Sequence, residues 1–136
     1  MAIHKNGLLF VCVGNGARSQ MAEAFARFIG PAEITYYSAG AVAGADLHVH
    51  AIKAMKEVGV DISQYRPKSM EQVPLATIAT VVSLCKASEC PALPEGVHHL
   101  SWPLPDPFEL AQGDNDTLVH FRRVRDQIRE LVSRLF

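Results

Sequence analysis

The chain has 136 residues, of which 49% are hydrophobic and 20% are charged, and its formal net charge is −1. This length is typical of one domain with a substantial buried core, so we expect residues 1–136 to form a single domain. The balanced charge gives no general attraction for nucleic acid or for a membrane surface, and we expect neither as a partner.

The sequence carries no sign of export or membrane insertion. No apolar run approaches the roughly 20 residues of a membrane-spanning helix, and Met1–Gly7 lacks the apolar core of a signal peptide. A cytoplasmic protein is therefore the expectation. The three cysteines, Cys12, Cys85 and Cys90, form an odd number on a short chain. In a reducing compartment this favours nucleophilic or redox use over structural disulfides.

The first predicted elements are a strand and a helix that are joined by a glycine-containing loop. The continuous apolar run over Gly7–Val13 predicts a buried parallel strand. Apolar residues at helical spacing over Ala17–Ile29 predict a helix that ends before Gly30 and Pro31.

This strand–loop–helix junction carries the residue types that oxyanion chemistry needs. Glycines allow the loop's backbone N–H groups to converge on one point, where the helix dipole adds positive potential. Arg18 supplies planar, bidentate donors for a tetrahedral anion. The same field favours thiolate over thiol at Cys12, which we expect to be the nucleophile, with the Ser19 hydroxyl as a donor to it. The alternative is an inert buried cysteine at a strand end.

The predicted oxyanion-binding residues follow Cys12 directly and are Val13, Gly14, Asn15, Gly16, Ala17, Arg18 and Ser19. Asn15 is expected to hold the shape of the loop, because asparagine tolerates left-handed backbone conformations. The loop is not a Walker A motif, since no Gly-Lys-Ser/Thr follows, and its two glycines do not form a dinucleotide fingerprint.

The rest of the chain alternates strands with helices. We predict strands over Glu33–Ala39, Thr77–Leu84 and Val97–Ser101, and helices over His48–Val58, Ser69–Gln72 and Asp116–Leu135. The segments Gly40–Leu47 and Trp102–Phe108 are predicted as loops, the second one set by its prolines. This alternation predicts an α/β domain with a parallel sheet and helices on both faces.

The stretch Cys12-Val-Gly-Asn-Gly-Ala-Arg-Ser-Gln-Met-Ala-Glu-Ala resembles the active-site loop of the low-molecular-weight protein tyrosine phosphatases. It is more similar to their relatives, the thiol-dependent arsenate reductases, in which Arg-Ser-Gln-Met-Ala-Glu is typical. The resemblance extends over nearly the whole chain. It implies a flavodoxin-like sheet of four parallel strands in the order 2-1-3-4. Cys12 then lies at the topological switch point, where open α/β sheets bind ligands.

The resemblance also implies roles for the other two cysteines. In similar arsenate reductases, a cysteine at the end of the third strand attacks the arsenylated nucleophile, and a second cysteine before a proline takes over the disulfide. Cys85 and Cys90-Pro91 match these positions by context, although their spacing departs from that of many family members. Five positions along a helix turn through about 500°, so a disulfide between them requires a loop or an unwound helix. The alternative is that both are core thiols.

Asp106 lies between Pro105 and Pro107, which fix the backbone on both sides. The phosphatases and reductases carry a general acid in an Asp-Pro loop after the last strand. The resemblance therefore implies that Asp106 protonates the departing oxygen. An ordinary turn aspartate is the alternative.

The resemblance also draws attention to Lys68. Some reductases bind a potassium ion through oxygen ligands that match Asn15, Glu23 and Ser38, and the family's aspartate ligand aligns with Lys68. We hypothesise that the ammonium group of Lys68 replaces the cation by bridging to Glu23. A solvent-exposed lysine is the alternative.

Two further patterns are informative by what they lack. Ala17 stands where several reductases carry a cysteine, which removes a thiol that could pair unproductively with Cys12. The pairs His48-x-His50 and His98-His99 have no further converging cysteine or acidic ligands in the sequence, so we expect no metal site.

Taken together, the resemblance implies an arsenate reductase with no bound cofactor and a requirement for an external thiol reductant. Cys12 attacks arsenate that is held by the loop and Arg18, and Asp106 protonates the leaving oxygen. Cys85 then attacks Cys12 and releases arsenite, and Cys90 or an external thiol resolves the oxidised enzyme. Thioredoxin and glutathione with glutaredoxin are both candidate carriers. We expect a monomer, because no extended apolar stripe remains once the core is assigned.

Two alternatives stay open from the sequence. A phosphatase acting on phosphate monoesters would use Cys12, Arg18 and Asp106 and leave Cys85 and Cys90 idle. A binding or redox-sensing module would hold an oxyanion without turnover.

Overall fold

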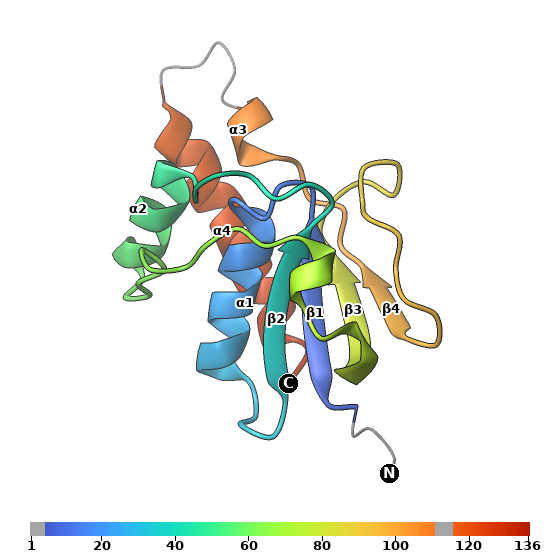
Figure 1. Ribbon diagram of the computed structural model, residues 1–136. Coiled ribbons are helices and arrows are strands. Elements are labelled where there is room, and N and C mark those ends of the chain that lie inside the picture. The colour runs from blue at the N-terminus through green and yellow to red at the C-terminus, as the bar shows by residue number, and fades with distance from the viewer. Residues whose placement is uncertain (1–4, 111–115) are drawn as a thin grey trace.

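Four parallel strands form one sheet in the order β2-β1-β3-β4 (Figure 1). The fold is seen in a computed structural model that describes residues 5–110 and 116–136. The strands run over Gly7–Cys12 (β1), Thr35–Gly40 (β2), Ile78–Ser83 (β3) and His98–Ser101 (β4). The predicted parallel α/β sheet and its order 2-1-3-4 are confirmed. The expectation that Met1–Gly7 is not part of a signal peptide falls partly on residues 1–4, which lie outside the described residues.

Helices connect β1 to β2 and β2 to β3, a turn and a loop connect β3 to β4, and two further helices follow β4. The α-helices are α1 (Arg18–Ile29), α2 (Val49–Glu57), α3 (Pro107–Leu110) and α4 (Thr117–Ser133), and two short 3₁₀ helices are η1 (Met70–Gln72) and η2 (Leu75–Thr77). The sequence did not indicate α3, which begins inside the predicted proline-set loop. Proline suits the first position of a helix because the N–H that it lacks would have no partner there. Within the described ranges, no helix is long and apolar enough to cross a membrane.

The prediction of helices on both faces holds only in part, because α1, α2 and α4 cover one face of the sheet and two short 3₁₀ helices with loops cover the other. Leu8 and Phe10 of β1 point to one face and join a large core with α1, α2 and α4. Leu9 and Val11 point to the other face, where η1, η2 and neighbouring loops pack against them. Successive side chains of a strand alternate between faces, so burial on both sides explains the continuous apolar run of β1.

The carboxyl ends of β1 and β3 lie side by side at one edge of the sheet (Figure 1). Val11 is in register with Ser83, and the next residue along, Leu84, donates its N–H to the Val11 carbonyl at 2.9 Å. Cys12 and Cys85 therefore leave their strands at the same edge, as the parallel arrangement predicts.

Candidate active site

The loop after Cys12 is held in place by a second segment, residues 41–48, which runs beside it. Four main-chain N–H groups of that segment donate to carbonyls of the loop: Ala41 to Cys12 (3.2 Å), Val42 to Val13 (3.0 Å), Gly44 to Gly14 (3.0 Å) and His48 to Gly16 (2.9 Å). In a trans peptide the C=O and N–H groups point in opposite directions. The N–H groups of the same peptides are therefore directed away from residues 41–48 and remain available for an anion.

Two backbone positions allow this arrangement. A Cβ atom on Gly40, the last residue of β2, would lie 2.7 Å from the Val13 carbonyl oxygen and 2.8 Å from the Asn15 nitrogen. Only glycine lets the loop pass this close to the end of β2. Asn15 has a φ of 56°, a left-handed conformation in a non-glycine residue. The left-handed conformation that asparagine tolerates is therefore the one that Asn15 adopts in the loop.

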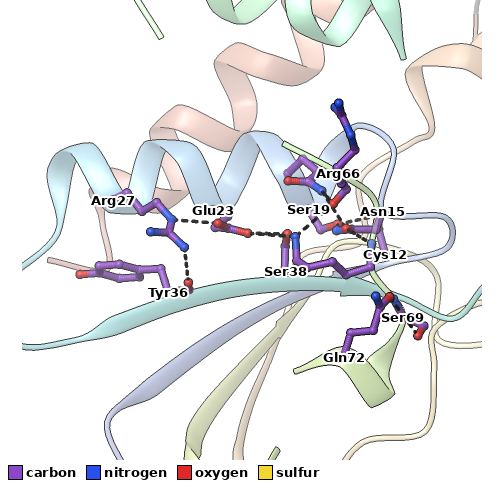
Figure 2. Close-up of polar contacts among 12 residues, drawn as sticks. Cys12, Asn15, Ser19, Glu23, Arg27, Tyr36, Ser38, Arg66, Ser69 and Gln72 are labelled. Atoms are coloured by element: carbon purple, nitrogen blue, oxygen red, sulfur yellow. Dashed lines mark hydrogen bonds and ion pairs between the residues drawn. The ribbon is translucent and has the colours of Figure 1, made fainter. Parts of the chain in front are cut away.

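The side chain of Asn15 is fixed by partners whose roles are unambiguous (Figure 2). The Lys68 main-chain N–H donates to Asn15 Oδ1 at 2.8 Å, and Gln20 Nε2 donates to the same oxygen at 2.8 Å. A main-chain N–H can only donate, so the atom that faces it must be the amide oxygen. The amide nitrogen then faces Ser19 and donates to its Oγ at 2.7 Å.

This orientation determines what Ser19 does for Cys12. Ser19 Oγ accepts the Asn15 amide hydrogen, and it lies 2.8 Å from Cys12 Sγ (Figure 2). The hydroxyl proton is thus free to point at the sulfur, where it stabilises a thiolate. Cys12 is only 2% exposed and is the free cysteine of the chain. The predicted Ser19–Cys12 contact is confirmed.

Arg18 begins α1 beside the loop and is 6% exposed. One guanidinium nitrogen, Nη1, donates to the carbonyls of Leu84 at 3.2 Å and Leu104 at 2.8 Å. These bonds join the end of β3 to the segment that carries Asp106. They also set the plane of the guanidinium, whose other N–H groups are left for an oxyanion.

A cleft of about 320 Å³ opens over the loop and brings together most of the predicted site. Its lining includes Cys12, Val13, Gly14, Gly16, Ala17, Arg18 and Asp106. Asn15 and Ser19 are fully buried beneath the loop and act through its shape and through the sulfur. Asp106 Oδ1 accepts the Phe108 N–H at 3.0 Å, which holds the carboxylate at the start of α3.

Three cleft residues were not predicted as part of a site: Asp46, His48 and Phe121. Phe108 also lines the cleft, and it matches the aromatic residue that follows the Asp-Pro motif in the phosphatases that the sequence resembles. His48 precedes α2, and its ring centroid lies 4.6 Å from that of Phe121 and 5.2 Å from that of Phe108. Burial lowers the pKa of His48 below its ordinary value of 6.5, and His50 adds to this decrease while Asp106 opposes it. His48 and Phe121 come together through the packing of α2 against α4, which no local sequence motif marks.

Cys85 and Cys90 form a disulfide, with their Cα atoms 5.7 Å apart. The segment between them is a turn rather than a helix, and the N–H groups of Glu89 and Cys90 both donate to the Lys86 carbonyl. The geometric condition for this disulfide, a non-helical segment, is therefore met. Cys85 is 1% exposed, whereas Cys90 is partly exposed.

Glu23 contacts the side chains that match the potassium ligands of some reductases or lie next to them (Figure 2). Its carboxylate accepts from Ser38 Oγ at 2.6 Å and from Arg27 Nε at 2.8 Å. Lys68 Nζ lies 3.9 Å from Glu23 Oε1, so the ion pair required by the hypothesis of a lysine bridge is present. Burial lowers the pKa of Lys68, and the Glu23 carboxylate opposes that decrease. In residues 5–110 and 116–136, no group of three or more histidine, cysteine or acidic side chains is arranged to hold a metal ion.

Comparisons with known proteins agree with this geometry. The family model described as low molecular weight phosphotyrosine protein phosphatase matches residues 7–136. An arsenate reductase of Halalkalibacterium halodurans is 38% identical over 128 residues, which cover 93% of this chain and 91% of that protein.

Solved structures give the same result. An arsenate reductase in the phosphate binding state has a TM-score of 0.79 and 35% identity, with 95% of both chains covered. A thioredoxin-dependent arsenate reductase of Corynebacterium glutamicum has a TM-score of 0.67 and 26% identity, over 96% of this chain and 62% of that one.

Proposed function

Because the chain belongs to the low molecular weight phosphotyrosine protein phosphatase family, we propose that it is an arsenate reductase that works through a thiol/disulfide relay. The observation that carries this proposal is the Cys85–Cys90 disulfide at the sheet edge that also holds Cys12. Hydrolysis of a phosphate ester needs one nucleophilic sulfur, and the Cys85–Cys90 pair would have no part in it. Reduction of arsenate needs two electrons, which a dithiol supplies as it becomes a disulfide.

In the first step, arsenate binds to the N–H groups of the loop and to Arg18. The Cys12 thiolate, stabilised by the Ser19 hydroxyl, attacks arsenic and forms a sulfur–arsenic bond. Asp106 gives its proton to the departing oxygen, which leaves as water. Hydrogen bonds from residues 41–48 hold the loop, so its donors need little rearrangement when negative charge develops on the arsenate oxygens.

In the second step, the thiolate of Cys85 attacks the sulfur of Cys12 and forms a disulfide with it. The electron pair of the sulfur–arsenic bond moves to arsenic, which is reduced from As(V) to As(III) and leaves as arsenite. Cys90 then attacks Cys85, which forms the Cys85–Cys90 disulfide and releases the Cys12 thiolate. A free Cys12 beside a Cys85–Cys90 disulfide is the state expected at the end of this sequence.

An external dithiol must then reduce the Cys85–Cys90 disulfide. Cys85 is 1% exposed and Cys90 is partly exposed, so the carrier's thiolate reaches Cys90 and Cys85 is the leaving group. The thioredoxin dependence of the Corynebacterium glutamicum relative favours thioredoxin as the carrier, and glutaredoxin with glutathione is the alternative. We propose the cytoplasm as the location, because the dithiol form of the enzyme requires a reducing compartment.

The decisive experiment follows arsenate-dependent oxidation of thioredoxin, and of glutaredoxin in a parallel assay, by wild-type protein and by Cys85→Ser. We expect Cys85→Ser to lose arsenate turnover while it keeps weak hydrolysis of p-nitrophenyl phosphate, because the first step does not use Cys85. Ser88→Ala, in the exposed turn of the same segment, is the matched control and should behave like the wild type. Equal arsenate turnover by Cys85→Ser and wild-type protein would contradict the relay.

A phosphatase is the second candidate function. The observation that favours it is the cleft itself, in which Cys12, Arg18 and Asp106 line a wall together with the half-exposed ring of Phe108. Arsenate and phosphate share charge and shape, so the first step is common to both reactions. Efficient hydrolysis of aryl phosphates that is unaffected by Cys85→Ser, without arsenate-dependent oxidation of either carrier, would support this function instead.

A further inference from the structure

His48 stands where three parts of the active site meet. Its main-chain N–H donates to the Gly16 carbonyl at 2.9 Å, so it is attached to the anion-binding loop. Its ring lies against Phe108, two residues after Asp106, with the centroids 5.2 Å apart. Its ring also lies against Phe121 of α4, with the centroids 4.6 Å apart. One residue thus contacts the loop that binds the anion and the segment that carries the acid.

The orientation of the His48 ring is set by α2. Nδ1 accepts the His50 N–H at 3.2 Å, as a cap for the first turn of the helix. With Nδ1 as acceptor, the neutral ring carries its proton on Nε2. Contacts with the rings of Phe108 and Phe121 leave the imidazole little freedom to rotate. The imidazole is therefore a fixed wall of the cleft.

Among the contacts that join the acid-bearing segment to the rest of the site, the Leu104 carbonyl accepts from Arg18, and the Phe108 ring lies against His48. Asp106 is held by bonds within its own short helix, in which it accepts the Phe108 N–H and its carbonyl accepts from Leu110. Phe108 is 49% exposed, so its contact with His48 accounts for part of its packing. General acid catalysis depends on the distance between the acid and the departing oxygen, and a displacement of about 1 Å can cost about a hundredfold in rate.

We propose that His48 is a positioning residue for Asp106, which it holds over the Cys12 loop through the contact of its ring with Phe108. The inference rests on the proposed function only through the first chemical step, in which Asp106 protonates a departing oxygen. That step is common to arsenate reduction and phosphate ester hydrolysis.

Two variants test the packing of the His48 ring and the acceptor role of its Nδ1 separately. His48→Asn keeps a side-chain acceptor for the His50 N–H and loses the ring, whereas His48→Phe keeps a ring that can contact Phe108 and Phe121 and loses the acceptor. His50→Asn is the matched control, because His50 also packs near Phe121, at 5.7 Å, but does not line the cleft. Each variant is assayed with arsenate, with p-nitrophenyl phosphate and with phenyl phosphate, whose leaving group needs the acid more.

We expect His48→Asn to lower kcat for arsenate and for phenyl phosphate by about tenfold, with a smaller loss for p-nitrophenyl phosphate and little change in KM. His48→Phe should recover most of this loss, and His50→Asn should match the wild type. In an Asp106→Asn background, His48→Asn should have little further effect, since the acid that it positions is gone.

Three results would overturn the inference. The first is an unchanged kcat in His48→Asn, and the second is an equal loss with both aryl phosphates, which indicates damage to the loop rather than to the acid. The third is a full additional loss in the Asp106→Asn background. A wild-type protein that turned over none of the three substrates would reject the proposed function, and His48's role with it, whereas an active wild type with an unchanged His48→Asn variant rejects this inference alone.

Discussion

The two sulfur-bearing regions of the molecule are built in opposite ways. Around Cys12, the carbonyls of the loop and the side chains of Asn15, Ser19 and Gln20 are tied into one buried network. Around Cys85 and Cys90, the chain makes a tight turn whose four intervening residues, 86–89, are exposed. The Cys12 region lies between the end of the central strand β1 and the start of α1. The Cys85–Cys90 turn follows β3 and is not itself part of a helix or strand.

This difference matches the two kinds of chemistry. Stabilising an oxyanion requires donors that are already in place when charge develops. A thiol relay requires sulfur atoms that approach different partners in turn, so the chain that carries them must change conformation.

Asn15→Ala should damage the rigid region most. The substitution removes the oxygen that accepts from the buried Gln20 amide and from the Lys68 main-chain N–H, and it places alanine at a φ of 56°. We expect the free energy of unfolding, measured with urea, to fall by about 3 kcal/mol. Ser88→Ala in the exposed turn should change it by less than about 0.5 kcal/mol. Similar losses at the two positions would remove the contrast between the regions.

Reduction of the Cys85–Cys90 disulfide should have a smaller effect. Its loop spans a sequence separation of 5, and closing so short a loop restricts the unfolded chain by about 2 kcal/mol. We therefore expect dithiothreitol to lower the free energy of unfolding of the wild type by about this amount. The double variant Cys85→Ser/Cys90→Ser should not respond to dithiothreitol. A loss as large as that of Asn15→Ala would mean that the turn is part of the rigid framework.

The free energy of unfolding should depend on pH through His48, whose main-chain N–H is bonded to the Cys12 loop. Burial lowers its pKa in the folded protein below 6.5, so the unfolded chain takes up the proton first as the pH falls. The folded state is therefore favoured above pH 6.5 and loses this advantage as the pH falls through the lowered pKa. We expect His48→Asn to show a shallower decline in urea stability than the wild type over this range. An identical decline would mean that His48 does not contribute to it.

The smallest expected effect concerns potassium. We propose that the ammonium group of Lys68, 3.9 Å from Glu23, takes the place of a cation in this region. Arsenate turnover should then be the same when potassium chloride replaces sodium chloride at equal ionic strength. Lys68→Asp, which supplies a carboxylate ligand instead of a positive charge, should gain a response to potassium. A marked activation of the wild type by potassium would reject the lysine bridge.

Sequence patterns predicted the elements whose signals are local. The apolar run of β1, the helical spacing of α1 and the proline-bracketed Asp106 each reflect interactions within a few residues. The positions of Cys12 and Cys85 at one edge followed from the parallel direction of the strands. These features required no knowledge of distant contacts.

The remaining features depend on contacts that leave no trace in residue types. Residues 41–48 support the anion-binding loop through main-chain N–H groups, which every residue except proline possesses. Gly40 is the one residue whose type indicates how closely the loop passes β2, because a side chain at this position would collide with the loop backbone. His48 looked like one half of an incomplete metal motif, and its place in the cleft depends on how α2 packs against α4.

The presence of Ala17 beside Cys12 has a practical consequence. Because the chain has three cysteines in all, each stage of the proposed cycle leaves a different set of sulfurs for alkylation under denaturing conditions. The dithiol form would gain three labels, the intermediate with a Cys12–Cys85 bond one label at Cys90, and the form described above one label at Cys12. Peptide mass spectrometry of quenched samples would then time each stage of turnover without any chromophore.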